Sequence, residues 1–395
     1  MAKRRIGILT GGGDVPGLNS VIKSVVYRGW ENGLEVVGIR KGFEGLTHVD
    51  LDDEASKARY VIDLNRENTR TIDRFGGTFL HSSRVGPTTV RDLPPHLVGR
   101  NIPATRGKAG MAYDLTDQVL ENLERLGIDS LIAIGGDGTL KSAALLERRG
   151  VKVMGIPKTM DNDVQGTEYC VGFSTAITRA TAAIDRQRTT IGSHERVGIF
   201  RVFGRDAGFT ALFAAHVTSN RCVIPEFPVD LEKLIDLLIT EKRDNPSNYV
   251  LVILSEGATW KGYEVQEFGR PDALGRRKKA SVAEVFADEI QARTGEETIV
   301  SDLTYDLRSG DPDFMDKLVA STFGTMALDA ILDGGHGQMS AIVNGCYELV
   351  PIPDPALKSR RVDVPTMYNV DRYRPLYGDK RHWPVFLTRV APPQG

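Results

Sequence analysis

The sequence predicts an α/β protein made of two Rossmann-like lobes, each with a mainly parallel sheet covered by helices, and an active site in the cleft between the lobes. Short apolar runs that are typical of buried strands alternate with helical patterns along nearly the whole chain. This alternation is characteristic of parallel sheets with helices on both faces. The 395 residues suffice for two domains, and no long low-complexity linker separates the lobes.

The expected elements follow from hydrophobic periodicity. Between residues 113 and 126, for example, Val119, Leu123 and Leu126 recur at the spacing of one helix face. The stretches 50–74 and 259–279 are weakly patterned, and the second is expected to be an exposed loop with a solvated basic run. Strands are expected at 5–9, 34–39, 130–134, 151–156, 197–202, 221–224 and 249–254, and helices at 17–30, 113–126, 140–149, 174–190, 209–218, 231–242, 282–293 and 314–332.

Composition and charge exclude several classes of protein. The formal net charge is −2, from 50 basic and 52 acidic residues, whereas a general nucleic-acid-binding domain is usually clearly basic. No apolar run approaches the roughly 20 residues of a membrane helix, and the apolar stretch 6–9 is too short for a signal sequence. The three cysteines lack metal-ligand spacing. We therefore expect a cytoplasmic protein that binds neither nucleic acid nor membrane.

Glycine-rich turns are the first candidate site. Glycine accounts for 41 of the 395 residues, which exceeds the average of about 7%. Residues 11–13 lie between a predicted strand and a predicted helix, where backbone N–H groups can point at an anion without obstruction from a Cβ atom. The turn matches neither the P-loop nor the dinucleotide-binding pattern, and a tight turn without a ligand is the alternative interpretation.

A second turn, residues 135–138, also follows a predicted strand and contains Asp137. A carboxylate beside bound phosphates is explained if it holds Mg²⁺, directly or through water. The alternative is that Asp137 only caps the following helix. Two such turns on adjacent strands would lie at the carboxyl edge of the sheet, where open α/β sheets bind ligands.

The third turn, residues 155–163, places Asp161 and Asp163 two residues apart, beside Lys158 and Thr159. These residues can supply a general base and a metal-binding acid. A calcium-binding loop is the competing interpretation, but the remaining ligand spacing of such a loop is absent.

Six motifs in this order resemble the phosphofructokinase family along nearly the whole chain. The glycine–aspartate–glycine turn also occurs in lipid and NAD kinases, and the 158–163 loop separates this chain from them. The motifs are residues 11–19, 76–84, 135–139, 157–163, 193–196 and 203–205, and Glu256 follows a strand where the family places a sugar-binding acid.

The resemblance implies transfer of the γ-phosphoryl group of ATP to the 1-hydroxyl of fructose 6-phosphate. Asp161 would take the proton of the hydroxyl and Thr159 would orient it, with Lys158 and Arg205 also in the catalytic set. Mg²⁺ near Asp137 would neutralise charge on the phosphates. The donor site would comprise Gly11, Gly12, Arg84, Gly136, Asp137, Gly138 and Thr139, with the N–H groups around Gly11 and Gly12 holding the phosphates.

The resemblance also implies where the sugar phosphate binds. Arg196 and Arg308 would bind its 6-phosphate, since a guanidinium group matches phosphate with two donors. Arg196 would reach the site of a neighbouring subunit, which implies a homodimer or homotetramer. The first lobe would comprise residues 1–172 and 307–357 and bind the donor, and the second would comprise 173–306 and 358–395. The sugar site would also include Thr159, Asp161, Asp163, Phe203, Gly204, Arg205, Glu256 and Tyr305.

Two positions bear on the phosphoryl donor and point in opposite directions. Gly138 leaves room for the α-phosphate of a nucleotide, where pyrophosphate-using relatives tend to carry aspartate. Lys158 is typical of pyrophosphate users. We favour ATP as the donor, because the additional ammonium group of Lys158 is compatible with bound ATP, whereas an aspartate at position 138 would obstruct it. A pyrophosphate-dependent phosphotransferase is the alternative.

A third possibility is a noncatalytic protein that only senses sugar phosphate, but such a protein should lack residues such as Asp161. Lys23 and Tyr27 replace effector-binding arginines of shorter bacterial members, which predicts an altered effector site.

Overall fold

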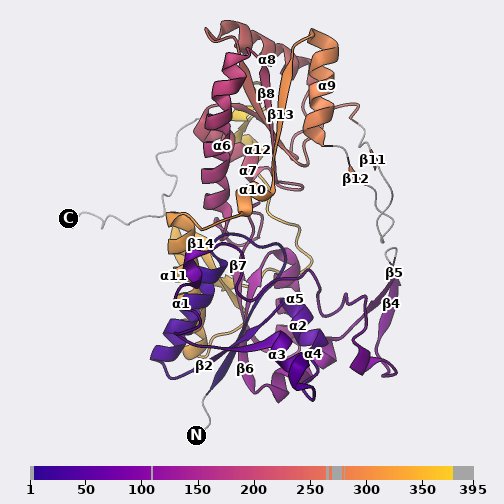
Figure 1. Ribbon diagram of the computed structural model, residues 1–395, viewed down its shortest axis with the longest axis vertical. Coiled ribbons are helices and arrows are strands. Elements are labelled where there is room, and N and C mark those ends of the chain that lie inside the picture. Colours follow the sequence, from indigo (N-terminus) through magenta and orange to yellow (C-terminus); the bar gives the residue numbers. More distant parts are fainter. Residues whose placement is uncertain (1–3, 108–109, 264–266, 269–277, 280, 377–395) are drawn as a thin grey trace, which may run out of the picture.

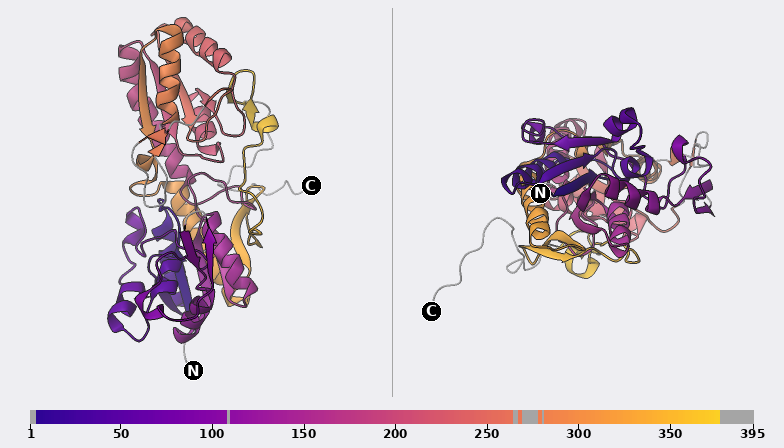
Figure 2. Two further views of the ribbon diagram at one scale, coloured as in Figure 1. Left: turned by 90° about the vertical axis from the view of Figure 1, so that its right-hand side faces the viewer. Right: turned by 90° about the horizontal axis from the view of Figure 1, so that it is seen from below.

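The structure, a computed structural model, has two lobes stacked along the long axis of the molecule (Figure 1). It describes residues 4–107, 110–263, 267–268, 278–279 and 281–376. Figure 2 shows the same two lobes from the side and from below. Each lobe is built on its own sheet, so the predicted α/β class with two sheet-based lobes is confirmed.

The lower lobe in Figure 1 contains a seven-stranded sheet. Its five central strands are parallel, and the strand at each edge is antiparallel to its neighbour. The order across the sheet is β15 (Cys346–Pro351), β14 (Gln338–Val343), β7 (Lys152–Pro157), β6 (Ile128–Gly135), β1 (Arg5–Thr10), β2 (Glu35–Ile39) and β3 (Val61–Leu64).

Helices cover both faces of this sheet because its strands alternate between two hydrophobic cores. Ile132 and Ile134 of β6 belong to the core under α1 (Leu18–Glu31) and α11 (Phe314–Leu332). Leu131 of the same strand belongs to the opposite core. That second core is covered by α2 (Phe43–His48), α4 (Thr116–Arg125) and α5 (Asp137–Arg148).

The upper lobe contains a four-stranded, fully parallel sheet. Its order is β13 (Thr298–Leu303), β8 (Val197–Val202), β10 (Val250–Ser255) and β9 (Arg221–Val223). The helices that pack on it are α6 (Phe173–Ser193), α7 (Phe209–Thr218), α8 (Leu231–Asp244) and α9 (Val282–Thr294).

Short elements complete the described residues. The lower lobe has α3 (Glu54–Tyr60), η1 (Ile72–Arg74), η2 (Pro95–Leu97) and the pair β4 (Ala104–Gly107) and β5 (Gly110–Tyr113). The rest of the chain adds β11 (Glu267–Phe268), β12 (Lys278–Lys279), α10 (Tyr305–Arg308), α12 (Val364–Met367), β16 (Tyr368–Asn369) and β17 (Arg374–Pro375).

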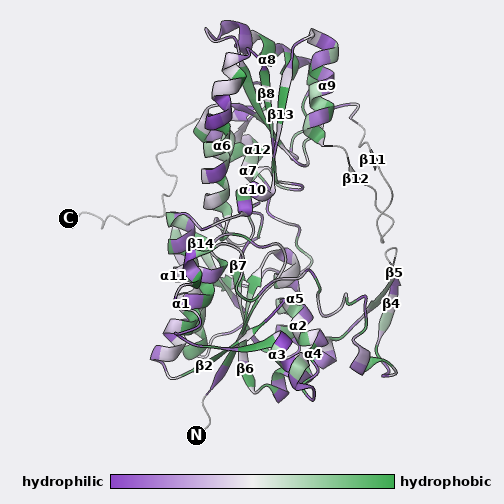
Figure 3. Ribbon diagram, viewed as in Figure 1, coloured by the Kyte–Doolittle hydropathy of each residue, from purple (hydrophilic) through white to green (hydrophobic). Residues whose placement is uncertain are grey.

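One hydrophobic core runs through both lobes. It extends from Ile8 of β1 through Val319 of α11 and Ile184 of α6 to Ile199 of β8. Figure 3 shows hydrophobic colours concentrated in the strands and mixed colours along helices such as α6 and α9. None of the described helices is both long and apolar enough to cross a membrane.

Most predicted elements are confirmed to within a few residues at either end, and the helix 314–332 has the predicted bounds. The stretch 50–74, whose weak pattern predicts no helix or strand, contains the regular elements α3, β3 and η1. β3 is a short antiparallel edge strand with one buried residue, so its sequence lacks the continuous apolar run of a central strand. The predicted loop 259–279 contains the β11–β12 pair, and residues 269–277 lie outside the described residues.

The predicted domain boundaries stay a prediction. All strands of the seven-stranded sheet lie within residues 5–157 and 338–351, and those of the four-stranded sheet lie within residues 197–303.

Asp316 of α11 joins the two lobes at their junction. Its buried carboxylate accepts hydrogen bonds from the Tyr169 hydroxyl (2.7 Å), the Gly172 N–H (2.7 Å) and the N–H and hydroxyl of Thr175 (2.8 and 2.5 Å). These donors lie just before α6 or in its first turn. One carboxylate therefore attaches a helix of the lower sheet to the helix that leads into the upper one.

We expect Asp316→Ala to lower the free energy of unfolding by about 3–5 kcal/mol, because it leaves several buried donors without an acceptor. Urea denaturation followed by circular dichroism measures the change. Asp329→Ala on the same helix removes a half-exposed partner of Arg28 and should cost under about 1 kcal/mol. Equal losses in the two variants would contradict the assigned role of Asp316.

Candidate functional site

Three loops converge at one edge of the seven-stranded sheet, because β1, β6 and β7 end level with one another. Thr10 at the end of β1 pairs with Ile134, and Gly135 at the end of β6 pairs with Pro157 of β7. The three strands are neighbours and parallel. The predicted turns that follow them therefore lie side by side at the edge that faces the upper lobe (Figure 1).

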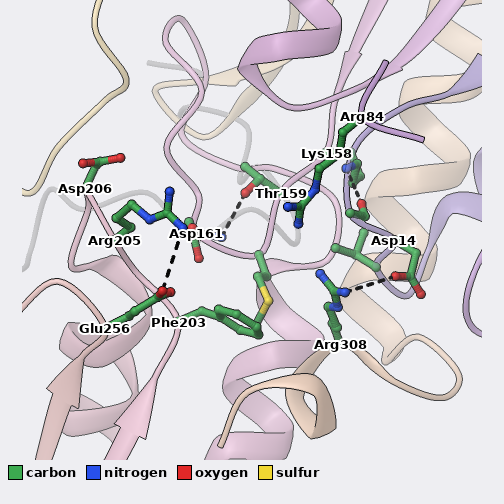
Figure 4. A pocket seen from close by; sticks show the side chains of 13 residues that line it. Asp14, Arg84, Lys158, Thr159, Asp161, Phe203, Arg205, Asp206, Glu256 and Arg308 are labelled. Atoms are coloured by element: carbon green, nitrogen blue, oxygen red, sulfur yellow. Dashed lines mark hydrogen bonds and ion pairs between the residues drawn. The ribbon is translucent and has the colours of Figure 1, made fainter. Parts of the chain in front are cut away.

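Two adjoining cavities open at this edge. The first has a volume of about 290 Å³ and is lined by both lobes. The second has a volume of about 730 Å³ and is lined by the lower lobe and Pro355. Gly13, Arg84, Lys158 and Thr159 line both cavities, which are therefore in contact. The first cavity is also lined by Asp14, Val15, Met160, Asp161, Phe203, Arg205, Asp206, Glu256 and Arg308 (Figure 4).

Asp161 presents a carboxylate to the first cavity. The next residue, Asn162, is buried with a left-handed φ of 53°, and its side chain bonds to the Glu168 carbonyl and the Cys170 N–H, both at 2.9 Å. This tight turn holds Asp161 with its Oδ1 atom buried and without a hydrogen-bond partner among the described residues. Such an atom is rare in folded proteins, and it marks a place for a ligand or water.

The surroundings of Asp161 favour its protonated form. Burial, followed by the charges of Asp163 and Glu256, raises the pKa of Asp161 to about 7, and Arg205 opposes the shift. Arg205 extends over the cavity with its side chain 78% exposed, and its Nη2 lies 4.0 Å from Glu256 Oε1. A carboxyl group with a pKa near 7 can take up and release a proton at neutral pH.

Cations line the boundary between the two cavities. The buried Lys158 ammonium donates to the carbonyl of Gly13, and burial lowers the pKa of Lys158 to about 8. Arg84 lies beside it, exposed to both cavities. Across the first cavity, Arg308 Nη2 lies 3.7 Å from Asp14 Oδ1. The positive groups of Arg84 and Lys158 thus lie beside each other, and both residues line both cavities (Figure 4).

The glycine turns line the second cavity, but Gly11 and Gly12 do so in a different way from that predicted. Their N–H groups are not directed at a ligand, because they donate to the carbonyls of Ile134 (2.9 Å) and Ser83 (2.8 Å). A Cβ atom on Gly11 would overlap the Thr139 hydroxyl. These glycines therefore provide close packing between turns. We expect the donors for an anion instead at the start of α5, where the first N–H groups of a helix lack intrahelical partners, apart from the Thr139 N–H, which donates to the Gly136 carbonyl at 2.9 Å.

Part of the lining of the second cavity is apolar. Phe43, Val85, Leu145 and Pro355 line this cavity, together with polar groups that include Arg148. The cavity is therefore lined both by the glycine turns with polar side chains and by apolar side chains, which suits a ligand that is partly polar and partly apolar.

Asp137 is not the N-cap of α5. Gly136 occupies that position without a side-chain bond, and Asp137 is the first helical residue. The Asp137 carboxylate accepts a hydrogen bond from the hydroxyl of Ser359. Burial, followed by the charge of Asp137, raises the pKa of Asp163 to about 6. The carboxyl groups of Asp137 and Asp163 are thus close enough to interact electrostatically.

The side chains fit Mg²⁺ only as a partner of bound phosphates. Among the described residues, no group of three or more histidine, cysteine, aspartate or glutamate side chains converges as a metal site. Mg²⁺ is commonly held by one or two carboxylates together with substrate phosphates and water. Asp137, at the rim of the second cavity, matches that requirement.

Four predicted site residues do not line either cavity. Arg196 lies at the opposite end of β8 from Phe203, roughly 20 Å away along the strand, and its Nε bonds to Glu297 Oε2 (2.7 Å). Gly204 shapes a turn with a φ of 124°. Tyr305 stacks on Arg308 at 4.7 Å and is 67% exposed. Asp163 belongs to neither lining, and its carboxyl group interacts with that of Asp137 as described above.

Sequence reasoning missed several residues that line or support the cavities. Asp14 lies within the motif 11–19 but was not predicted as a site residue, and Asp206 directly follows the motif 203–205. Pro355 and Ser359 follow the last strand of the sheet by several residues, in a stretch without a recognisable motif. Their position beside Asp137 arises only from the path of the folded chain.

Comparisons with known proteins agree on one family. The family model described as "Phosphofructokinase" matches residues 5–331. The chain is 36% identical to an ATP-dependent 6-phosphofructokinase of Streptomyces coelicolor over 89% of this chain and 94% of the relative. It is 38% identical to a pyrophosphate–fructose 6-phosphate 1-phosphotransferase of Amycolatopsis methanolica over 86% and 90%.

A solved structure supports the fold. Phosphofructokinase from Saccharomyces cerevisiae superposes with a TM-score of 0.71 and 24% identity over 89% of this chain. The present chain spans 45% of that longer yeast chain. At this level of identity, the likeness concerns the fold alone.

We expect Asp161→Asn to stabilise the folded protein at pH 8, by roughly 1–4 kcal/mol, since the folded pKa of about 7 exceeds the ordinary value of 3.8. Below about pH 4 the carboxyl group is protonated in both states, so the variant and the wild type should unfold alike. As the pH rises from about 4 to 7, the unfolded chain ionises first and the wild type loses stability.

Urea unfolding between pH 4 and 8 measures this difference. Asp371→Asn changes a carboxylate whose side chain is 85% exposed, so it serves as the matched control without a pH-dependent gain. An Asp161→Asn curve parallel to that of the wild type across the range would contradict the raised pKa.

Proposed function

Because this chain belongs to the phosphofructokinase family, we propose that it transfers the γ-phosphoryl group of ATP to the 1-hydroxyl of fructose 6-phosphate, which gives fructose 1,6-bisphosphate and ADP. The observation that carries the proposal is the unpartnered, buried carboxylate oxygen of Asp161 in a cavity that adjoins a second, larger one. The sugar phosphate occupies the first cavity and the nucleotide the second.

Asp161 acts as the general base. The acceptor hydroxyl lies against its free oxygen and loses its proton as the new P–O bond forms. Thr159 lies beside it, with its hydroxyl accepting the Asp161 N–H at 3.2 Å, and orients the acceptor. The raised pKa of Asp161 keeps the group basic enough to take a proton near neutral pH.

Cations at the junction of the cavities stabilise the transferring group. In the transition state, negative charge spreads over the three equatorial oxygens of the transferring phosphoryl group. Arg84 and Lys158 lie at that junction, and Arg205 reaches over the acceptor side. A bound Mg²⁺ at Asp137 would neutralise charge on the donor phosphates.

The sugar phosphate is held by groups on both lobes. Arg308 faces the cavity from α10 and Glu256 from the end of β10. A guanidinium group suits the 6-phosphate, and a carboxylate suits sugar hydroxyls. Arg196 lies too far from the cavity of its own chain, which supports a homodimer or homotetramer in which it reaches the site of a neighbour.

The size and lining of the second cavity support ATP as the donor. Pyrophosphate requires only groups that bind phosphates, whereas a nucleotide also offers a base that can pack on apolar side chains such as Phe43, Val85, Leu145 and Pro355. A Cβ atom on Gly138 would have no neighbour within 4 Å, so the room for an α-phosphate is open.

The second candidate is a pyrophosphate-dependent phosphotransferase that acts on the same sugar. The buried Lys158 ammonium at the junction of the cavities favours it, because a small, highly charged donor gains most from a fixed cation. Relatives of both kinds are similarly close in sequence to this chain.

We expect Asp161→Asn to lower kcat by about 10²–10⁴-fold, because an amide cannot accept the proton of the hydroxyl. Binding of fructose 6-phosphate, followed by isothermal titration calorimetry, should change little. A coupled assay of fructose 1,6-bisphosphate formation measures the rate. Wild-type turnover in this variant would remove Asp161 from the catalytic role.

Gly138→Asp should raise the KM for ATP at least about tenfold, since its carboxylate repels the donor phosphates within a low-dielectric cavity. The fold should tolerate the change, given the open space around Gly138. Gly138→Ala is the matched control and should keep a nearly normal KM. Initial rates with ATP and with pyrophosphate test the donor directly. Efficient turnover with pyrophosphate and none with ATP would favour the second candidate.

A further inference from the structure

A segment beyond the family-model match crosses the outside of the site. The match ends at residue 331, and the chain continues through β14 and β15 before residues 354–362 pass from the lower lobe to the upper one. We name residues 354–362 the strap. Figure 2 shows the yellow end of the chain running along both lobes in the left view.

The strap is bonded to both lobes along its length. At its beginning, Asp354 Oδ2 pairs with Arg148 Nη2 at 3.2 Å, and Ser359 bonds to Asp137. At its end, Arg361 Nε donates to the Asp206 carbonyl at 2.9 Å, and the Val362 N–H donates to Glu226 Oε1 at 2.9 Å. The strap therefore touches the donor turn, the acceptor side and the core of the upper lobe.

Arg360, in the strap, supports the loop that carries Asp161. Its N–H donates to the Asp163 carbonyl at 2.7 Å. Its guanidinium Nη1 donates to the carbonyls of Thr167 at 2.9 Å and Asn162 at 3.3 Å. The guanidinium also stacks on the ring of Phe209 at 4.4 Å. A single residue thus bonds to three carbonyls of one loop.

These bonds hold the backbone of the loop, and Arg360 is not among the residues that line the two cavities. Asn162, which follows Asp161, has a left-handed backbone, a conformation that asparagine adopts more readily than most other residues and that its local hydrogen bonds stabilise here. The Asn162 side chain holds the turn through Glu168 and Cys170, and the guanidinium of Arg360 donates to the Asn162 carbonyl. Removal of the guanidinium would leave two partly buried carbonyls without this donor.

We propose that Arg360 is a positioning residue that acts through Asp161, fixing the loop so that the carboxylate faces the acceptor hydroxyl. The inference rests on the proposed function for its kinetic consequence, but the hold on the loop can be tested without turnover. Arg360 lies beyond residues 5–331, which the family model matches.

The first experiment measures the loop itself. Hydrogen–deuterium exchange of peptides from residues 158–168 should become faster in Arg360→Ala, because loosened backbone bonds exchange more readily. Arg374→Ala is the matched control, since it removes an arginine of the same tail that bonds to the Ser219 carbonyl (3.0 Å) and Glu241 Oε1 (2.6 Å). That control should leave exchange in the 158–168 loop unchanged.

The second experiment tests whether Arg360 acts through Asp161. Arg360→Ala should lower kcat roughly 10- to 100-fold, because a small displacement of a catalytic group is costly, and should leave the KM for fructose 6-phosphate within about threefold. In the Asp161→Asn background the same substitution should lower kcat by less than about threefold, since groups that act as a unit are not additive. Arg374→Ala should leave kcat near that of the wild type.

Two outcomes would overturn the inference: unchanged loop exchange in Arg360→Ala, or equal losses of kcat in the wild-type and Asp161→Asn backgrounds. Should Arg360→Ala fail to fold, Arg360→Lys tests the same point, since lysine keeps the charge without the planar group that stacks on Phe209. It should change loop exchange and kcat in the same direction. An Asp161→Asn variant with full activity would instead refute the proposed base, while the exchange result would still report on Arg360.

Discussion

The level carboxyl ends of three parallel strands are the constraint on which the site depends. Backbone hydrogen bonding between β1, β6 and β7 aligns Thr10 with Ile134 and Gly135 with Pro157. Each strand then leads into its loop at the same height of the sheet, so a glycine turn, a helix N-terminus and the Asp161 loop meet at one edge. A shift of one residue in any strand would reverse which side chains face each core. The two hydrophobic cores therefore enforce the register that brings the loops together.

The site is assembled at the expense of stability. The carboxyl group of Asp161 and the ammonium group of Lys158 line the same cavity at the end of the sheet, and both are largely shielded from water. Burial penalises the charged form of each, which explains why both pKa values move toward neutrality. Other parts of the molecule offset this cost to the folded state, above all the hydrophobic core that is continuous through α11 and α6 and the hydrogen bonds to Asp316.

The path of the chain after β15 completes the junction of the lobes. Pro355 forms part of the wall of the larger cavity, and Ser359 bonds to Asp137. Further along, the Tyr368 hydroxyl donates to the Cys222 carbonyl at 2.6 Å, which ties the end of the described chain to β9 of the upper sheet. The cleft is thus bounded by three chain crossings: the start of α6, the start of α11 and this returning segment.

The sequence alone determined the fold class, because buried parallel strands leave continuous apolar runs and covering helices leave a periodic stripe. It also identified Asp161, Lys158 and the glycine turns, because loop chemistry after a strand is local. Three features were decided only by the tertiary structure. The N–H groups of Gly11 and Gly12 are taken by Ile134 and Ser83, the strand β3 depends on pairing at an edge, and Ser359 and Arg360 support residues about 200 positions earlier in the chain. Such contacts depend on how distant segments pack in space, and no periodicity or motif in the chain encodes that packing locally.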